Sequence, residues 1–511
     1  MVVINMVSKI EASGIIGIDA VSVEVEVDVG HGLPSFQIVG LPDTACRESQ
    51  ARVRSAIKNS GFKFPGNHKI MVNLAPADVK KEGSSFDLAI AIGILSASGQ
   101  IECEGIPECS FSGELSLDGR VRGVHGTLSR TSRAADQKRR FIFPWSNRIE
   151  ASCIQNAMLQ PVHTLEEAIK SIGLFDIQIQ KKWKFVQQPS KEHTSDFADV
   201  KGQYFAKRGI EVAAAGGHNA LMIGPPGSGK TMIAKRIPSI LPSLKFKEAV
   251  EVTKIHSVAG QLRRRGQLIQ TPPFRVPHHS VSYAALAGGG TVPKPGEISL
   301  AHSGVLFLDE LPEFRRDALE VLRQPLEEGH ITISRAAQSM TFPANFMLVC
   351  AMNPCPCGYY TDDNHECSCS PLQIRNYMGK VSGPLLDRID IHLQLNALKP
   401  NDFDTCTKAE NSEAIRDRVM KCRELQNDRY KDLHYQLNAD LDVRDIDKYC
   451  VMSKAAEDFF KQALEELGFS GRAFHKVKKI ARSIADLANE EIIQLPHVQE
   501  AVHYRSIDRR T

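Results

Sequence analysis

A glycine-rich loop between an apolar strand and a helix constrains the fold more than any other feature of this sequence. The stretch LMIGPPGSGKTMIAKRI (221–237) fits the pattern G-x-x-x-x-G-K-[ST]. In such a loop, backbone N–H groups turn inward around phosphates, the lysine reaches the β- and γ-phosphates, and the last hydroxyl takes Mg²⁺. The sequence therefore predicts a nucleotide site formed by Gly224, Pro225, Pro226, Gly227, Ser228, Gly229, Lys230 and Thr231.

Two apolar stretches further along the chain end in polar side chains that suit the same chemistry. GVLFLDELPEF (304–314) reads as a buried strand followed by Asp309, expected to hold Mg²⁺, and Glu310, expected to polarise the attacking water. FMLVCAMNP (346–354) ends in Asn353, which is expected to orient that water beside the γ-phosphate. Taken alone, the acidic pair could cap a helix and Asn353 could form a turn. Their order after the phosphate loop favours catalysis.

Two arginines complete the predicted catalytic set. Arg388, in SGPLLDRIDIH, is expected to reach a neighbouring subunit's γ-phosphate as an arginine finger. Arg472, in FSGRAFHK, opens a helix and could close a lid over the same phosphate. The alternative for both is a surface ion pair, for example between Arg388 and Asp387 or Asp390.

Four cysteines gather in NPCPCGYYTDDNHECSCSP (353–371), as two C-x-C pairs separated by nine residues. A tetrahedral Zn²⁺ site needs four soft ligands, which Cys355, Cys357, Cys367 and Cys369 supply, and His365 could replace one of them. Independent thiols and a redox switch are the alternatives, although a C-x-x-C motif is missing. We expect a structural zinc clasp that stiffens the segment between Asn353 and Arg388.

Composition limits the class of protein and its compartment. The 511 residues are enough for two to four domains, and 42% hydrophobic with 24% charged residues is typical of a globular protein. We find neither a run of eighteen apolar residues nor a secretory signal, so no membrane span and a cytoplasmic location are expected. In that reducing compartment the twelve cysteines are expected to be thiols or metal ligands. A net charge of +3 does not by itself indicate a nucleic-acid partner.

The pattern of apolar residues predicts a multidomain α/β chain. Residues 1–175 alternate strands and helices: strands at 21–30 and 68–76, a helix at 43–61 with Asp43 as its N-cap, and a buried helix at 84–99. Residues 176–199 are polar and read as a linker. Residues 200–395 form a second α/β region that includes the cysteine loop 355–369, and residues 396–511 are helical and charged.

The order GPPGSGKT, FRVPHHSVSYAALAGGG, PKPGEISLAHSGVLFLDELPEF, AMNPCPCG and SGPLLDRIDIH resembles the magnesium-chelatase-like AAA+ ATPases, in particular their bacterial competence-protein group. The resemblance covers nearly the whole chain. It implies an N-terminal S5/Lon-protease-like α+β domain, a central AAA+ P-loop domain and a C-terminal helical lid. It also implies a hexameric ring, an ATP-dependent helicase that drives branch migration of DNA during homologous recombination in natural transformation. Its expected partners are single-stranded and branched DNA.

Two insertions are candidates for DNA contact. GHITISRAAQSMTFPANF (329–346) reads as a hairpin, and related helicases put such a hairpin into the central pore, where Arg335 would contact phosphate. The second insertion, about 256–300, carries the basic run Arg263, Arg264 and Arg265, which in a pore would neutralise phosphates. A solvated hairpin and a solvated basic face are the alternatives. His278 and His279 in this insertion are expected to be structural.

Lon-type proteolysis requires a serine activated by a lysine. The buried helix carries no serine near its start, GRVRGVHGTLSR (119–130) carries no lysine, and Ser84 and Ser85 are expected to cap the helix. We therefore expect a non-proteolytic domain that contacts DNA or assembles the ring. The competing functions are the ATPase subunit of a magnesium chelatase and a MoxR-like protein remodeller that binds no DNA.

Overall fold

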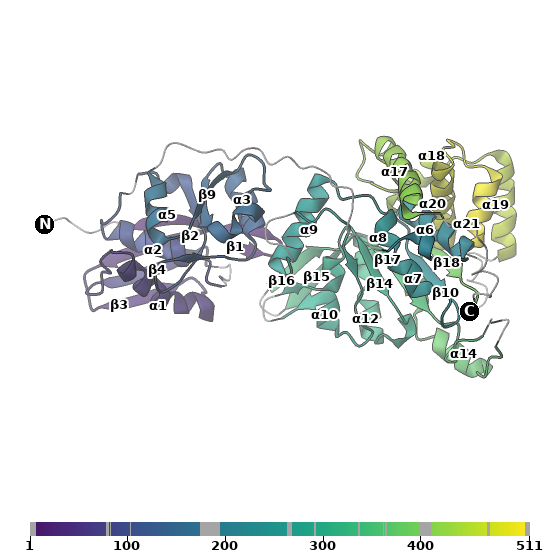
Figure 1. The fold of residues 1–511 in the computed structure, drawn as a ribbon, viewed down its shortest axis with the longest axis horizontal. Helices are drawn as coiled ribbons and strands as arrows, with labels where there is room; N and C mark the ends of the chain where they lie inside the picture. Colours follow the sequence, from purple (N-terminus) through teal and green to yellow (C-terminus); the bar gives the residue numbers. More distant parts are fainter. Residues whose placement is uncertain are drawn as a thin grey trace. The chain divides into compact units, whose positions relative to one another are not determined.

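The structure is a computed structural model of the chain and describes residues 7–77, 81, 83–102, 104–173, 195–262, 268–290, 293–335, 338–360, 362, 365–397, 410–467 and 471–505. It divides into two compact units, Met1–Val186 with Phe246–Ile269, and Gln187–Lys245 with Gln270–Thr511. Both units contain a sheet and helices, so the predicted α/β class is confirmed (Figure 1). No helix within the described ranges is both long and apolar enough to cross a membrane.

The first unit is built on a mixed seven-stranded sheet in the order β3-β4-β2-β1-β5-β8-β9. Its strands are β1 (Ser8–Ile16), β2 (Asp19–Gly30), β3 (Ser35–Val39), β4 (Lys69–Ala75), β5 (Cys109–Phe111), β8 (Arg140–Pro144) and β9 (Met158–Val162), with a small hairpin of β6 (Glu114–Leu115) and β7 (Val121–Arg122). Its helices are α1 (Thr44–Asn59), α2 (Asp87–Ala97), α3 (Thr127–Asp136), α4 (Arg148–Ala151), α5 (Leu165–Ile172) and α9 (Phe246–Val258). The predicted strands at 21–30 and 68–76 are confirmed, as is α1 with Asp43 at its N-cap, whose carboxylate accepts from the Cys46 N–H at 2.7 Å.

Helix α2 is the buried helix that the sequence predicts. All eleven of its residues are buried, because it packs against β1 and β2. Gly93 makes this approach possible, since a Cβ there would lie 2.5 Å from Val27. The carboxylate of Asp87, also buried, is neutralised by Arg52 at 2.6 Å.

The prediction that Ser84 and Ser85 cap α2 is wrong. Phe86 occupies the N-cap without a side-chain hydrogen bond, Ser84 donates to Glu114, and Ser85 accepts from the Arg130 guanidinium at 3.1 Å. Each hydroxyl is therefore hydrogen-bonded to a charged side chain and not to the first turn of α2. Burial lowers the pKa of Arg130 to about 10, which still leaves it protonated at neutral pH. It therefore cannot act as the base that Ser85 would need as a nucleophile.

Helix α9 lies between two segments of the second unit in sequence but belongs to the first unit. Sequence reasoning placed this stretch inside the region 200–395. Lys254 pairs with Asp19 at 3.0 Å, and the Ser257 hydroxyl donates to Glu150 at 2.7 Å and accepts from the Gly126 N–H at 3.1 Å. The chain therefore passes between the units on both sides of Phe246–Ile269.

The second unit is built on a five-stranded sheet in the order β11-β14-β17-β10-β18, in which all neighbouring strands are parallel. The strands are β10 (Ala220–Ile223), β11 (Phe274–Arg275), β14 (Val305–Leu308), β17 (Met347–Met352) and β18 (Ile391–Gln394), with hairpins of β12 (Gly288–Gly289) and β13 (Lys294–Pro295) and of β15 (His330–Arg335) and β16 (Gln338–Pro343). Residues of β10, β14 and β17 are entirely buried, as expected for parallel strands covered on both faces.

Helices surround this sheet and form the C-terminal part of the unit (Figure 1). Around the sheet are α6 (Tyr204–Gly216), α7 (Lys230–Ala234), α8 (Ile237–Ile240), α10 (Tyr283–Ala287), α11 (Glu297–Leu300), α12 (Arg316–Glu320), α13 (Arg323–Glu328), α14 (Pro371–Met378) and α15 (Gly383–Leu386). The C-terminal helices are α17 (Ser412–Arg429), α18 (Val443–Tyr449), α19 (Lys454–Leu467), α20 (Gly471–Leu487) and α21 (Leu495–His503), of which α17 and α20 pack on α6. Single turns of 3₁₀ helix lie at Ile106–Glu108, Trp145–Asn147, Phe197–Asp199, Leu311–Glu313 and Asn438–Asp440.

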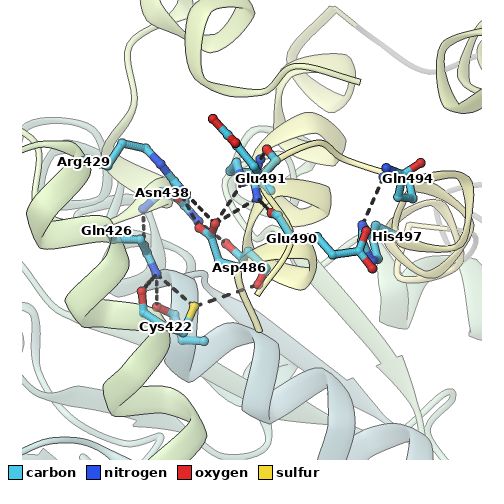
Figure 2. A network of polar contacts seen from close by, with 12 residues as sticks. Cys422, Gln426, Arg429, Asn438, Asp486, Glu490, Glu491, Gln494 and His497 are labelled. Atoms are coloured by element: carbon cyan, nitrogen blue, oxygen red, sulfur yellow. Dashed lines mark hydrogen bonds and ion pairs between the residues drawn. The ribbon is translucent and has the colours of Figure 1, made fainter. Parts of the chain in front are cut away.

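A buried polar network centred on Asp486 joins the C-terminal helices (Figure 2). Its carboxylate accepts from Arg429 at 2.6 Å, from Arg482 at 3.0 Å and from the Asn438 amide at 2.8 Å. Gln426 extends the network to α6 by donating to the Ala215 carbonyl at 2.9 Å. Because a buried charge is costly without such partners, the network holds the C-terminal end of α20 in place.

Candidate nucleotide site and metal centre

The sheet order brings three predicted groups to one edge. Strand β10, which leads into the phosphate loop, is paired with β17, and β17 with β14. Asn353 follows β17, and Asp309 with Glu310 follows β14. Since the carboxyl ends of parallel strands face the same side, these residues meet at the crevice where open α/β sheets bind ligands.

The phosphate loop has the backbone geometry that its glycines permit. Gly227 and Gly229 have φ of +77° and +92°, in the left-handed region that favours glycine. Gly224 passes so close to Leu395 that a Cβ would lie 2.5 Å from its carbonyl oxygen. The loop therefore keeps its backbone exposed toward a ligand while packing tightly against the sheet.

Lys230 is buried and lies folded into its own loop. Its ammonium donates to the carbonyls of Gly224 at 2.7 Å and Pro225 at 2.9 Å, and to the Asn353 amide oxygen at 3.2 Å. Burial lowers the pKa of Lys230 to about 8, against a weaker opposing effect of Asp309. The ammonium is therefore still mostly charged at neutral pH, and bound phosphates would stabilise this charged form further. The contact with Asn353 joins two groups that sequence reasoning assigned to the same site.

Thr231 and Asp309 fit a magnesium ion. The Thr231 hydroxyl donates to the Asp309 carboxylate at 2.7 Å, so both oxygens lie where one hard cation could be bound together with phosphate and water. The other oxygen of Asp309 accepts from the Glu310 N–H at 3.0 Å.

Glu310 is held by a residue that sequence reasoning missed. Its backbone is left-handed, with φ of +54°, and its carboxylate lies 3.2 Å from Nδ1 of His279. His279 was expected to be structural because no carboxylate stands near it in sequence. The missed signal is strand order: β11 and β14 are parallel neighbours, so residues after β11 come close to residues after β14.

Arg388 and Arg472 meet each other at Glu327 of α13. Arg388 donates to the Pro384 carbonyl at 2.6 Å and pairs with the Glu327 carboxylate, which also lies 3.7 Å from Arg472. Next to them, Lys476 of α20 pairs with Asp390 at 2.7 Å. Burial raises the pKa of Asp390, but Lys476 and His218 outweigh burial and lower it to about 2. The ion pair therefore fixes the start of α20 beside Arg388.

A cavity of about 420 Å³ opens beside Glu310 and Asn353. Its lining also includes Pro356 of the cysteine loop, and Asn376 and Tyr377 of α14. The cavity provides space for water next to the two groups that are expected to activate and orient it.

The structure brings the four predicted cysteine ligands together. Their sulfur atoms all lie within 4.8 Å of one another, with Cys355, Cys357 and Cys367 at 3.3, 3.5 and 3.6 Å in pairs. These separations exclude disulfides, whose S–S bond is about 2.05 Å, and are near the ~3.8 Å edge of a tetrahedron with Zn–S of about 2.3 Å. Throughout the described ranges, this is the one group of metal-ligating side chains found. His365 contacts Asp362 at 3.3 Å instead.

The candidate DNA-contacting residues are described only in part. The predicted hairpin is confirmed as β15 and β16, in which Arg335 is paired in register with Gln338 next to the tip. Arg263, Arg264 and Arg265 lie outside the described residues. Gly288 joins the second insertion to this hairpin, since a Cβ there would lie 2.6 Å from the Ile333 side chain.

Family models match most of the chain and define its class. They are Subunit ChlI of Mg-chelatase over residues 25–147, Magnesium chelatase, subunit ChlI, over 196–403, and Magnesium chelatase, subunit ChlI C-terminal, over 409–505. This family is of the AAA+ ATPase type, which implies ATP and Mg²⁺ as ligands.

Similarity to individual proteins shows to which group within this family the chain belongs. The chain is 43% identical to Competence protein ComM of Haemophilus influenzae, over 96% of both chains, and 42% identical to the uncharacterised protein YifB of Salmonella typhimurium, over 97% of this chain and 96% of that one. It is 28% identical to the Magnesium-chelatase 67 kDa subunit of Chlorobaculum parvum, over 31% of this chain and 23% of that one. The chain belongs to the ComM/YifB family of magnesium-chelatase-like proteins.

Proposed function

We propose that this chain is a cytoplasmic, hexameric, ATP-driven DNA helicase that promotes branch migration during homologous recombination in natural transformation. The contact between His279 and Glu310 carries the proposal, because it ties the candidate catalytic carboxylate to the insertion that packs on the β15–β16 hairpin. The similarity to a protein named for competence supports the choice of DNA as substrate. A reducing compartment also suits four free thiols.

In this proposal each residue of the nucleotide site has one role. Lys230 and the backbone N–H groups of 227–231 bind the phosphates, and Thr231 and Asp309 would hold Mg²⁺, which would neutralise charge at the phosphates. Glu310 accepts a proton from the attacking water, and Asn353 orients that water. Arg388 leaves Glu327 and contacts a neighbouring subunit's γ-phosphate as an arginine finger. Arg472 also leaves Glu327 and closes the helical lid over the same phosphate. The domains proposed are 1–175, a linker at 176–199, the AAA+ domain at 200–395 and a helical lid at 396–511.

Zinc bound by Cys355, Cys357, Cys367 and Cys369 is part of the proposal. Its support is the sulfur geometry, together with two N–H groups that donate to sulfur: Cys357 to Cys369 at 3.4 Å and Gly358 to Cys355 at 3.2 Å. Such bonds to sulfur stabilise thiolate ligands.

Arg388→Ala should leave ATP binding intact and lower hydrolysis by about 10³- to 10⁵-fold, the range attributed to arginine fingers. ATP affinity and turnover of the purified variant check this. If the finger acts between subunits, mixing Arg388→Ala with Lys230→Ala chains should restore part of the activity, since intact sites then face intact fingers. Unchanged turnover, or no recovery on mixing, would contradict the assignment.

His279→Ala should raise the ATPase rate without DNA and reduce the ratio of the DNA-stimulated to the unstimulated rate, because Glu310 is released from its restraint. An exposed histidine–carboxylate contact contributes no more than the about 0.2–1 kcal/mol of an exposed ion pair, so the change should be at most about fivefold. His278→Ala is the control for loss of a neighbouring imidazole, because the His278 ring contacts Ser280 at 2.8 Å and lies 4.1 Å from the ring of His279. Equal behaviour of the two variants would count against a specific role for His279.

Unwinding of a branched DNA junction tests the proposed function as a whole. The full chain should separate the strands with ATP and not with a non-hydrolysable analogue, and Arg335→Ala should weaken DNA binding across sequences. Arg315→Ala is the control, because Arg315 is an exposed arginine of the second unit that is paired with Asp317 at 2.9 Å. A chain that hydrolyses ATP but leaves junctions intact would favour the chelatase-type alternative. The similarity to the Chlorobaculum parvum subunit supports that alternative.

A further inference from the structure

The cysteine loop touches the phosphate loop directly. Gly358 lies one residue after Cys357, has φ of +91°, and would place a Cβ 2.6 Å from Cδ and 2.8 Å from Cγ of Pro226. Only glycine fits this position without moving one of the two loops. Gly358 also donates its N–H to the Cys355 sulfur at 3.2 Å, so one residue joins the thiol cluster to the phosphate loop.

The other end of the cysteine loop returns to Asn353. Ser370, directly after Cys369, caps α14 by accepting from the Gln373 N–H at 3.3 Å, while its own N–H donates to the Gln373 side chain at 2.8 Å. One turn further on, Tyr377 is buried and lines the same cavity as Asn353. Asn353 in turn contacts Lys230 at 3.2 Å.

The contacts therefore close a ring. It runs from Pro226 through Gly358 to the four thiols, through α14 to Asn353, and through Lys230 back to the phosphate loop. Cys355 is fully buried within this ring, whereas the other three cysteines are partly exposed. Four thiolates at these separations repel one another unless a cation is shared between them, so Zn²⁺ would hold the four sulfur atoms, and with them the ring, in one arrangement.

We propose that Zn²⁺ held by Cys355, Cys357, Cys367 and Cys369 positions the phosphate loop and Asn353, so that nucleotide affinity and turnover depend on zinc occupancy. The cysteines are positioning residues here, since they touch neither the phosphates nor the attacking water. This inference rests on the proposed nucleotide and zinc sites. It adds that zinc binding at the four cysteines controls nucleotide binding at the phosphate loop.

The test uses the full chain and measures zinc per chain, the Kd for a fluorescent ATP analogue, and ATP turnover. Cys367→Ser should lose zinc and bind the analogue at least about tenfold more weakly, the range seen when groups that support a site are removed. Chelation of wild type should have the same effect, and added Zn²⁺ should reverse it. His365→Ala is the matched control in the same loop, because its ring contacts Asp362 and no sulfur, and it should match wild type in all three readouts.

Gly358→Ala separates positioning from metal loss. It keeps all four sulfur ligands, so zinc content should stay at the wild-type value while nucleotide affinity falls, because the added methyl group pushes Pro226 away. A variant that loses zinc but binds and hydrolyses ATP like wild type would overturn the inference. Purified wild type that contains no zinc and is still fully active would also overturn it. Zinc-loaded wild type that binds no nucleotide would instead overturn the proposed function.

Discussion

Lys230→Ala is expected to remove most of the affinity for nucleotide. Lys230 is the one cationic residue at positions 224–231. In this structure its ammonium donates hydrogen bonds to the carbonyls of Gly224 and Pro225. Two hydrogen bonds from a charged group are worth about 3–6 kcal/mol together, so affinity should fall by roughly 10²- to 10⁴-fold. Titration with a fluorescent ATP analogue measures this directly.

Lys235→Ala is the matched control for that titration. Lys235 lies at the end of the same helix, α7, and is exposed, so its loss should leave affinity unchanged. Equal affinity of Lys230→Ala and wild type would remove the nucleotide site from positions 224–231.

Glu310→Gln should bind ATP like wild type and fail to hydrolyse it. The amide keeps the size of the side chain but cannot accept a proton from water, and general-base catalysis contributes about 10²- to 10⁴-fold. Turnover should fall by that factor while the Kd for ATP stays the same, which single-turnover measurements can resolve.

Glu313→Gln is the control for Glu310→Gln. Glu313 lines the same cavity but pairs with Lys380 at 3.3 Å, so a turnover close to that of wild type is expected. Equal losses in both variants would mean that the charge of the cavity, and not a specific base, supports hydrolysis.

Local signals were sufficient to predict the elements that carry the nucleotide site. The phosphate loop has glycines at fixed spacing, and β10, β14 and β17 are short apolar runs. All three strands lie where the sequence predicts them. The spacing of the two C-x-C pairs similarly anticipated that Cys355, Cys357, Cys367 and Cys369 would meet.

What sequence reasoning missed depends on partners far away in the chain. His279 meets Glu310 only because β11 and β14 are neighbours, and neither residue carries a local sign of the other. Helix α9 joins the first unit through Asp19 and Glu150, more than a hundred residues earlier. The pairing of Ser85 with Arg130 likewise replaced the cap that local propensity favoured.

The structure also shows a contact of the cysteine loop that the sequence did not predict. From sequence it stiffens the segment between Asn353 and Arg388, which lie on either side of it. In the structure it also reaches Pro226, through Gly358, a contact across more than a hundred residues. The glycine in CPCG is the only local trace of that contact.

Steady-state ATP hydrolysis by the purified full chain, with and without single-stranded DNA and beside Glu310→Gln, tests the central claim most directly. A nucleic-acid motor predicts that DNA raises the rate strongly and that Glu310→Gln abolishes both the basal and the stimulated rate. Robust hydrolysis that does not respond to DNA would contradict a DNA motor and would point to a protein partner as the substrate.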